Sequence, residues 1–196
     1  MNDFAASTGT ATDELAAYED AMINIYNNNF GESFEDIAAS MGQIKQIMGE
    51  GLGADELEKM TTNALMLRDT FDFDVSESVR AANSLMDQFG LSADEAYNLI
   101  AQGAQNGLNQ NGDLLDVLNE YSVQFSMMGY DAEDMFNMLS NGAENGTWSV
   151  DKLGDAMKEF NIRTKDGSQT TEEAFQKLGI VVSDIFCKGA KIFLAI

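Results

Sequence analysis

The sequence predicts an all-α protein in which about nine helices pair as stacked antiparallel hairpins. Three observations support this prediction. The 196 residues contain no proline, the residue that most often interrupts a helix. Apolar residues recur every three or four positions along most of the chain, which is the period of one buried helix face. Because 44% of the residues are apolar, the chain can bury a core.

Four helices are expected in the first part of the chain, with boundaries set by capping residues and glycines. They are expected over residues 12–28, opened by Thr12; from Ser33 to Met48; from near Gly53 onward; and from Asp74, paired with Glu77, to Gly90. Asp36 follows Ser33 by three residues, the spacing of a capping box, and Gly49 is the expected stop of that helix. The alternation in FDFD (71–74) is too short to predict a strand.

The next part of the chain contains an internal repeat. Residues 89–121 align with residues 128–160 at an offset of 39, with ten of 33 positions identical. Each copy is interpreted as helix, Asn-Gly turn, helix, with Ser92 and Glu95 as a capping box and Ser149 as a cap. Weaker similarity at the same offset relates LGADE (52–56) to LSADE (91–95) and TEEAF (171–175) to AEDMF (132–136). Any capped amphipathic hairpins would share some of these features, but the matched turn glycines favour a true repeat of stacked hairpins.

Two regions are predicted. Residues 1–165 form the acidic helical-repeat region, and residues 166–196 form a short helix and an apolar C-terminal tail. A polar loop is expected over residues 161–168, followed by a helix that Thr170 and Glu173 open and Gly179 closes. The tail, residues 180–196, carries the single cysteine, Cys187, and has no assigned role.

The charge is strongly negative and uneven. Residues 1–151 hold 27 acidic and four basic residues, whereas residues 152–196 hold six acidic and seven basic residues. Such a surface repels nucleic acid and anionic membranes, and it suits a basic protein partner or simple solvation. The side chains selected as candidate partner contacts are Trp148, Asp72, Asp74, Glu95, Glu133 and Asp134.

No residue pattern predicts catalysis, a cofactor or a metal. Histidine is absent, which removes histidine-based triads and zinc sites, and one cysteine without histidine is a poor nucleophile. Two Asn/Gly-rich loops fail as calcium loops because Leu118 and Lys152 stand where the bidentate glutamate is required. The apolar tail is interrupted by charged residues, so a membrane span is not expected. The methionines are interpreted mainly as core residues, with a partner surface as the alternative.

Six longer runs have a distinctive composition: NFGESFED (29–36), TNALMLRDTF (62–71), ESVRAAN (77–83), GAQNGLN (103–109), LNEYSVQF (118–125) and DKLGDAMKEFNIR (151–163). These runs resemble the conserved N-terminal region of phage tail tape-measure proteins, also called minor tail proteins. The resemblance covers about residues 4–180. It implies a helical segment with no catalytic residues, located in the virion tail and in the host cytoplasm before assembly.

The family resemblance also implies partners. Tape-measure proteins template polymerisation of the tail tube and set its length, which implies tail tube or tail-assembly chaperone proteins as partners. Family members are far longer than this chain. Even as one continuous helix, the chain would extend only about 290 Å, so it does not measure a long tail alone. A fragment, a truncated gene product and a segment with another use all remain consistent with this length.

Two functional hypotheses follow. The first is a structural or assembly segment of a tape measure. The alternative is a free-standing acidic inhibitor, like some anti-CRISPR proteins, that mimics nucleic acid and binds a basic host effector such as a nuclease. The sequence specifies neither the partner nor the oligomeric state.

Overall fold

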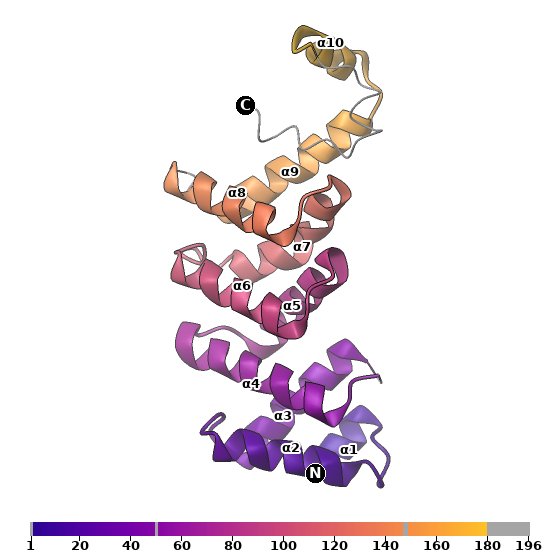
Figure 1. Cartoon of the computed structure of the whole chain (residues 1–196), viewed down its shortest axis with the longest axis vertical. Coiled ribbons are helices and arrows are strands. Elements are labelled where there is room, and N and C mark those ends of the chain that lie inside the picture. Colours follow the sequence, from indigo (N-terminus) through magenta and orange to yellow (C-terminus); the bar gives the residue numbers. More distant parts are fainter. Residues whose placement is uncertain (1, 50, 147–148, 180–196) are drawn as a thin grey trace. The chain divides into compact units, whose positions relative to one another are not determined.

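The computed structural model describes residues 2–49, 51–146 and 149–179, and every regular element in these ranges is an α-helix (Figure 1). The helices are, in chain order, α1 (Asn2–Thr8), α2 (Leu15–Asn27), α3 (Phe34–Met48), α4 (Ala54–Phe71), α5 (Val75–Phe89), α6 (Ala93–Gln105), α7 (Leu114–Met127), α8 (Ala132–Glu144), α9 (Val150–Lys165) and α10 (Gln169–Lys177). The predicted all-α class is confirmed.

The helix starts follow the predicted repeat. Helices α2, α4, α6 and α8 begin at residues 15, 54, 93 and 132, a constant step of 39 residues. Helices α5 and α7 keep the same step, from Val75 to Leu114. The repeat therefore extends N-terminally to α2, beyond the segments where sequence identity reveals it. Helix α9 departs from the step, because it begins at Val150 rather than at Leu153, nearly one turn early.

The chain forms two compact units. Unit 1 contains residues 1–86 and 91–102, and unit 2 contains residues 87–90 and 103–196. In unit 1, α3 packs against both α2 and α4, α4 also lies against α2, and α1 lies against α3. In unit 2, α8 packs against α7 and α9, and α9 also lies against α7. Helices α2 and α4, and likewise α7 and α9, are equivalent helices of successive hairpins that pack on each other. The boundary near residue 165 stays a prediction.

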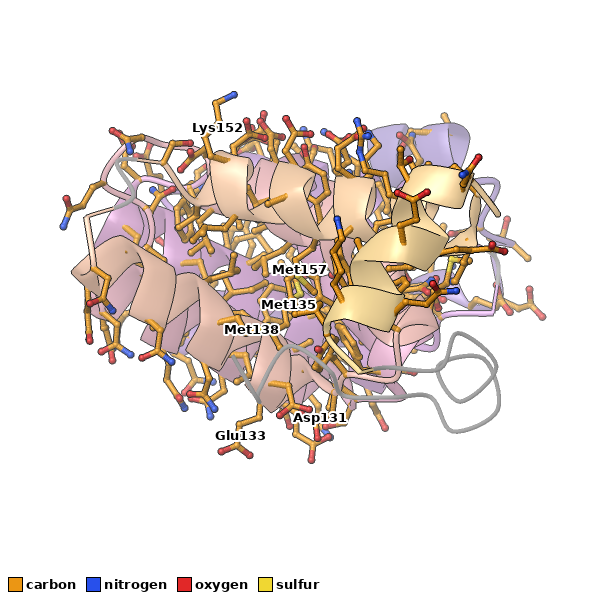
Figure 2. The ribbon with its side chains drawn as sticks, turned by 90° about the horizontal axis from the view of Figure 1, so that it is seen from above. Asp131, Glu133, Met135, Met138, Lys152 and Met157 are labelled. Atoms are coloured by element: carbon orange, nitrogen blue, oxygen red, sulfur yellow. The ribbon has the colours of Figure 1, made fainter. Side chains whose placement is uncertain are left out.

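The apolar stripes form the cores of these units, as their periodicity predicts. Ile37, Met41 and Ile44 of α3 are at most 1% exposed. In unit 2, Met135 and Met157 are buried between helices, whereas Asp131, Glu133 and Lys152 point outward (Figure 2). Met41, Met60, Met135 and Met157 are thus core residues, while Met48, Met86 and Met138 are half-buried.

Several predicted helix ends are confirmed. The Ser33 side chain accepts a hydrogen bond from the Asp36 N–H, and Gly49 and Gly90 have φ of 89° and 70°. Ser92 and Glu95 form both bonds of the predicted capping box.

The N-terminal helix α1 was not predicted. Its seven residues are too few to display a helical period. The Phe4 side chain is buried, and its ring centroid lies 5.3 Å from that of Tyr18. The prediction that Thr12 opens the next helix is wrong. Helix α2 begins at Leu15, and its cap residue Glu14 makes no side-chain capping bond.

Three details near the C-terminal part of the repeat also differ. Ser149 does occupy the cap position of α9, but its hydroxyl donates to the Asp113 carboxylate, 2.6 Å away, instead of capping the helix. Residues 161–165 belong to α9 rather than to a loop, since the Asn161 side chain is buried and donates to Gln124. The last helix is capped by Ser168, not by Thr170. Ser149 and Asn161 form hydrogen bonds with residues 36 and 37 positions earlier in the chain, and Ser168 caps the last helix in place of Thr170. These bonds explain why the local sequence pattern gave the wrong prediction.

A glycine permits the close packing of α7 on α9. A Cβ atom at Gly154 would overlap the Tyr121 ring. The Tyr121 hydroxyl donates to Asp155 at 3.0 Å and to Asp151 at 3.2 Å, so the ring is held over the glycine. Burial, together with these carboxylates, raises the pKa of the Tyr121 phenol.

Gly154→Ala is expected to lower the free energy of unfolding by about 1–3 kcal/mol, because the added methyl group overpacks the α7–α9 contact. The control is Gly42→Ala in α3, another helical glycine, where the added Cβ would meet its nearest neighbour at 3.5 Å. There the better helix propensity of alanine should give no loss and a gain of up to about 1 kcal/mol. Urea unfolding followed by circular dichroism measures both changes. Equal effects at the two sites would contradict this account.

An ion pair joins α3 to α4. The Arg68 guanidinium donates to Asp36 Oδ1 at 2.8 Å, and the Glu32 N–H donates to Asp36 Oδ2 at 2.9 Å. Burial alone would raise the pKa of Asp36, but the hydrogen bonds from Arg68 and Glu32 outweigh it and lower the pKa below 3.8. A carboxylate whose pKa is lowered on folding stabilises the protein above its unfolded pKa, and this contribution is lost as the pH falls through the folded pKa.

Asp36→Asn should therefore destabilise unit 1 at pH 7 by about 1 kcal/mol, a modest figure because the pair is partly exposed. The difference from the wild type should shrink as the pH falls through the folded pKa of Asp36, which lies below 3.8, since Asp36 then becomes protonated in the folded state as well. Glu159→Gln removes the exposed pair with Arg163 and serves as control, with an expected change of at most about 0.5 kcal/mol. A pH-independent effect of Asp36→Asn would refute the assigned role of its charge.

Candidate partner-binding surface

Many acidic residues of the described helices lie in the first helical turn. There they face backbone N–H groups that have no partner within the helix, and they interact favourably with the helix dipole. These residues are Glu35, Asp36, Asp55, Glu56, Glu77, Asp94, Glu95, Asp116, Glu133, Asp134, Asp151 and Glu172. Part of the negative charge is thus explained by helix stability alone.

Glu95, one of the predicted contact residues, caps α6. Its carboxylate accepts hydrogen bonds from the Ser92 N–H at 2.8 Å and from the Ser92 hydroxyl at 2.7 Å. The bond from the Ser92 N–H, followed by that from the hydroxyl, lowers the pKa of Glu95. A partner that engaged this carboxylate would have to compete with these bonds.

Asp134, another predicted contact residue, belongs to a second capping box. The Asp131 carboxylate accepts a bond from the Asp134 N–H at 2.8 Å, and Asp134 accepts one from the Asp131 N–H at 3.4 Å. Asp131 was not among the predicted caps, although aspartate caps a helix as well as serine does and Asp74 was predicted as a cap on that basis. Glu133, between them, has an exposed side chain that points away from the helices (Figure 2).

Asp72 and Asp74 lie in the connection between α4 and α5. Asp72 ends α4 in the left-handed conformation, with φ 59° and ψ 34°, and Asp74 accepts a bond from the Glu77 N–H at 2.9 Å. Both aspartates are exposed, while Phe73 between them is buried. The alternating pattern therefore marks a turn that anchors one ring in the core and leaves two carboxylates at the surface.

The predicted contact residues belong to different units. Asp72, Asp74 and Glu95 are in unit 1, and Glu133 and Asp134 are in unit 2. Trp148 lies outside the described residues. The structure thus places several exposed acids on each unit.

Residues 81–151 carry negative charge without any positive charge, because they contain 11 acidic residues and no lysine or arginine. Helices α6, α7 and α8 lie wholly within this stretch. The first basic residues after it, Lys152 and Lys158, lie on α9, and Lys158 pairs with Glu120 at 3.0 Å. A partner of α6–α8 should therefore present positive charge.

Among the described residues, no three acidic or cysteine side chains are grouped closely enough to bind a metal ion. No helix in this part of the chain combines the length and apolar character of a membrane span.

Comparison with known proteins identifies related sequences. The model of the phage-related minor tail protein family matches residues 26–190. Over 34 residues the chain is 56% identical to the "Probable tape measure protein" of Streptomyces phage phiC31, covering 17% of this chain and 5% of that protein. Over 95 residues it is 31% identical to "Uncharacterized protein YqbO" of Bacillus subtilis (strain 168), covering 48% of this chain and 6% of that protein. The matches thus span only a small fraction of each relative's length. No solved structure matches the chain.

Exposed acids and capping acids should respond differently to neutralisation. Asp131→Ala should lower the free energy of unfolding by about 1 kcal/mol, because it removes the cap of α8. Glu133→Gln, two residues away and exposed, should change it by less than about 0.5 kcal/mol. Urea unfolding of both variants measures the difference. A loss for Glu133→Gln as large as that for Asp131→Ala would mean that Glu133 is also structural.

Proposed function

The chain belongs to the phage-related minor tail protein family, and we propose that it acts as a structural or assembly segment of a tape measure, without catalytic chemistry of its own. The family match over most of the chain is the observation that carries this proposal. The repeated helical hairpins are consistent with it, because they form an extended protein-binding scaffold in many repeat proteins. The segment would act in the virion tail, and in the host cytoplasm before assembly.

The proposed partner is a basic surface of the tail tube or of a tail-assembly chaperone. The base-free stretch of residues 81–151 supports a partner of this charge. Among the candidate contacts, Asp72, Asp74, Glu95 and Glu133 have exposed side chains. Asp74, Glu95 and Asp134 would contribute less, since they accept capping hydrogen bonds. Trp148 stays a candidate anchor, since aromatic residues are frequent in binding hot spots.

The same base-free stretch favours one alternative. A run of helices with only negative charge could occupy the nucleic-acid channel of a basic host effector such as a nuclease, as an anti-CRISPR-like decoy. The tail role takes precedence, because many of these acids cap or begin helices and so need no mimicry to explain them.

Binding to purified tail tube and tail-assembly chaperone proteins of the same phage tests the tail role. The wild-type chain should bind at low salt and weaken as salt rises. The double variant Asp72→Asn, Glu133→Gln should bind about 3–10-fold more weakly, as expected for two peripheral charge contacts. The control Glu172→Gln, Glu173→Gln removes the same charge from α10 and should bind like the wild type.

Absence of binding to either protein at low salt would refute the proposed tail partners. Competition with nucleic acid for a host nuclease would instead support the inhibitor alternative. Equal weakening by the two double variants would mean that net charge matters rather than the named residues.

A further inference from the structure

Unit 1 exposes a cluster of large apolar side chains on α2 and at the start of α3. Ile23, Tyr26 and Phe34 are 39%, 43% and 41% exposed, and they are the large exposed apolar residues of the described part of unit 1. The Tyr26 and Phe34 rings stack with centroids 4.4 Å apart. Exposed aromatic residues that gather in this way usually mark an interaction surface.

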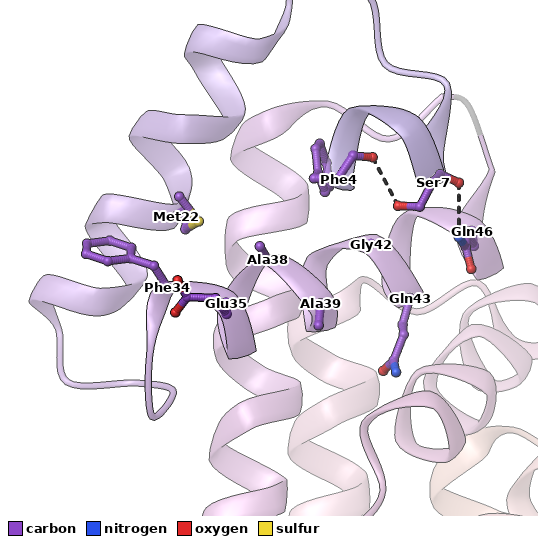
Figure 3. Close-up of a pocket in the computed structure, with 10 residues that line it drawn as sticks. All are labelled: Phe4, Ser7, Met22, Phe34, Glu35, Ala38, Ala39, Gly42, Gln43 and Gln46. Atoms are coloured by element: carbon purple, nitrogen blue, oxygen red, sulfur yellow. Dashed lines mark hydrogen bonds between the residues drawn. The ribbon is translucent and has the colours of Figure 1, made fainter. Parts of the chain in front are cut away.

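A hollow of about 460 Å³ adjoins this cluster. Figure 3 shows it between α1, α2 and α3, with Met22 and Phe34 at one side, Ala38 along its floor, and Phe4 and Ser7 at the other side. We call the hollow and the three exposed apolar residues the α2–α3 groove.

The corresponding helix face is covered in unit 2. Helices α3 and α9 both follow a cap serine, Ser33 and Ser149. Counted from these serines, Ala38 corresponds to Gly154, on which the Tyr121 ring of α7 packs. Gly42 corresponds to Lys158, which pairs with Glu120 of α7. This face therefore accommodates a packed helix in the same fold.

In unit 1 the described residues cover the C-terminal half of this face, through the seven-residue helix α1. Its Ser7 carbonyl accepts a bond from Gln46, and Phe4 and Ser7 are the groups nearest to Gly42. The N-terminal half of the face, around Phe34 and Ala38, lines the open hollow instead.

The charge around the groove indicates the kind of helix that fits. Glu19, Glu32 and Glu35 are exposed on or beside α2 and α3. The one basic residue of this segment, Lys45, is 6% exposed and donates to the Tyr18 hydroxyl, so it does not neutralise the rim. An apolar groove with an acidic rim fits a helix with an apolar side chain flanked by basic residues.

The last turns of α9 have this character. Ile162 is 53% exposed, and Arg163 and Lys165 are the basic residues of the final turn. Within the described part of the chain, Arg163 pairs with the exposed Glu159 of its own helix at 3.3 Å, a weak contact that a second partner can replace.

We propose that the α2–α3 groove of one copy of this chain binds the last two turns of α9 of a second copy. Ile162 enters the hollow beside Phe34 and Ala38, while Arg163 and Lys165 face Glu32 and Glu35. The two surfaces differ, so each copy offers one groove and one helix end to other copies. This association needs no tail protein, so its test is independent of the proposed function.

Sedimentation velocity of the full chain, at low and high salt over a wide concentration range, tests the proposal. At low salt the average mass should rise with concentration above the 21.4 kDa of one chain, and high salt should lower it. Phe34→Lys, which blocks the groove, and Ile162→Asp, which blocks the helix, should each weaken association at least about tenfold, or about 1.4 kcal/mol. Met127→Asp alters another exposed apolar residue and should associate like the wild type.

Mixing provides the decisive result. Phe34→Lys retains a functional α9 and Ile162→Asp retains a functional groove, so an equal mixture should form dimers and nothing larger. Glu35→Lys should weaken association with the wild type and recover it with Arg163→Glu. Circular dichroism should show wild-type helicity for every variant.

A wild-type chain that stays monomeric up to about millimolar concentration at low salt would overturn the proposal. Oligomers that persist in both single variants would also overturn it, because another surface would then hold the copies. So would a mixture that forms no dimers although both variants are folded.

Discussion

Coverage of each helical hairpin by its neighbour is the physical constraint on which this structure depends. Two amphipathic helices cannot bury their apolar stripes against each other alone, so the equivalent helix of the next hairpin must complete the core. In unit 1 this is the packing of α2 on α4, and in unit 2 that of α7 on α9. The constant step of 39 residues between the starts of α2, α4, α6 and α8 gives successive hairpins equivalent apolar faces.

Polar contacts between successive hairpins fix that register more narrowly than apolar packing does. Tyr121 binds Asp155, Ser149 binds Asp113 and Asn161 binds Gln124, so α7 and α9, with their cap residues, are joined at three points. In unit 1 the Arg68–Asp36 pair has the same role. A shift by one helical turn would leave these polar groups partly buried without hydrogen-bond partners. Each unsatisfied buried group costs about 1–3 kcal/mol of folding free energy.

The same arrangement explains why the surface carries the proposed biology. Apolar residues are used to join hairpins, and acids remain outside, where many also stabilise helix N-termini. The chain, a member of the phage-related minor tail protein family, thus exposes charged helix surfaces. Part of the apolar stripe of α3 lines the hollow between α1, α2 and α3.

The sequence by itself determined the helical class, the 39-residue step and most helix ends, since periodicity, Ser92 with Glu95 and the left-handed Gly49 and Gly90 act locally. It also singled out exposed acids such as Glu133, but it could not separate them from capping acids such as Asp134, because both look alike on a helix. Tertiary structure alone decided the packing of α1 on α3, the use of Ser149 to bind Asp113, and the hollow between α1, α2 and α3. These features arise from contacts between residues about 30–40 positions apart, and no local pattern encodes which neighbour will satisfy a given side chain.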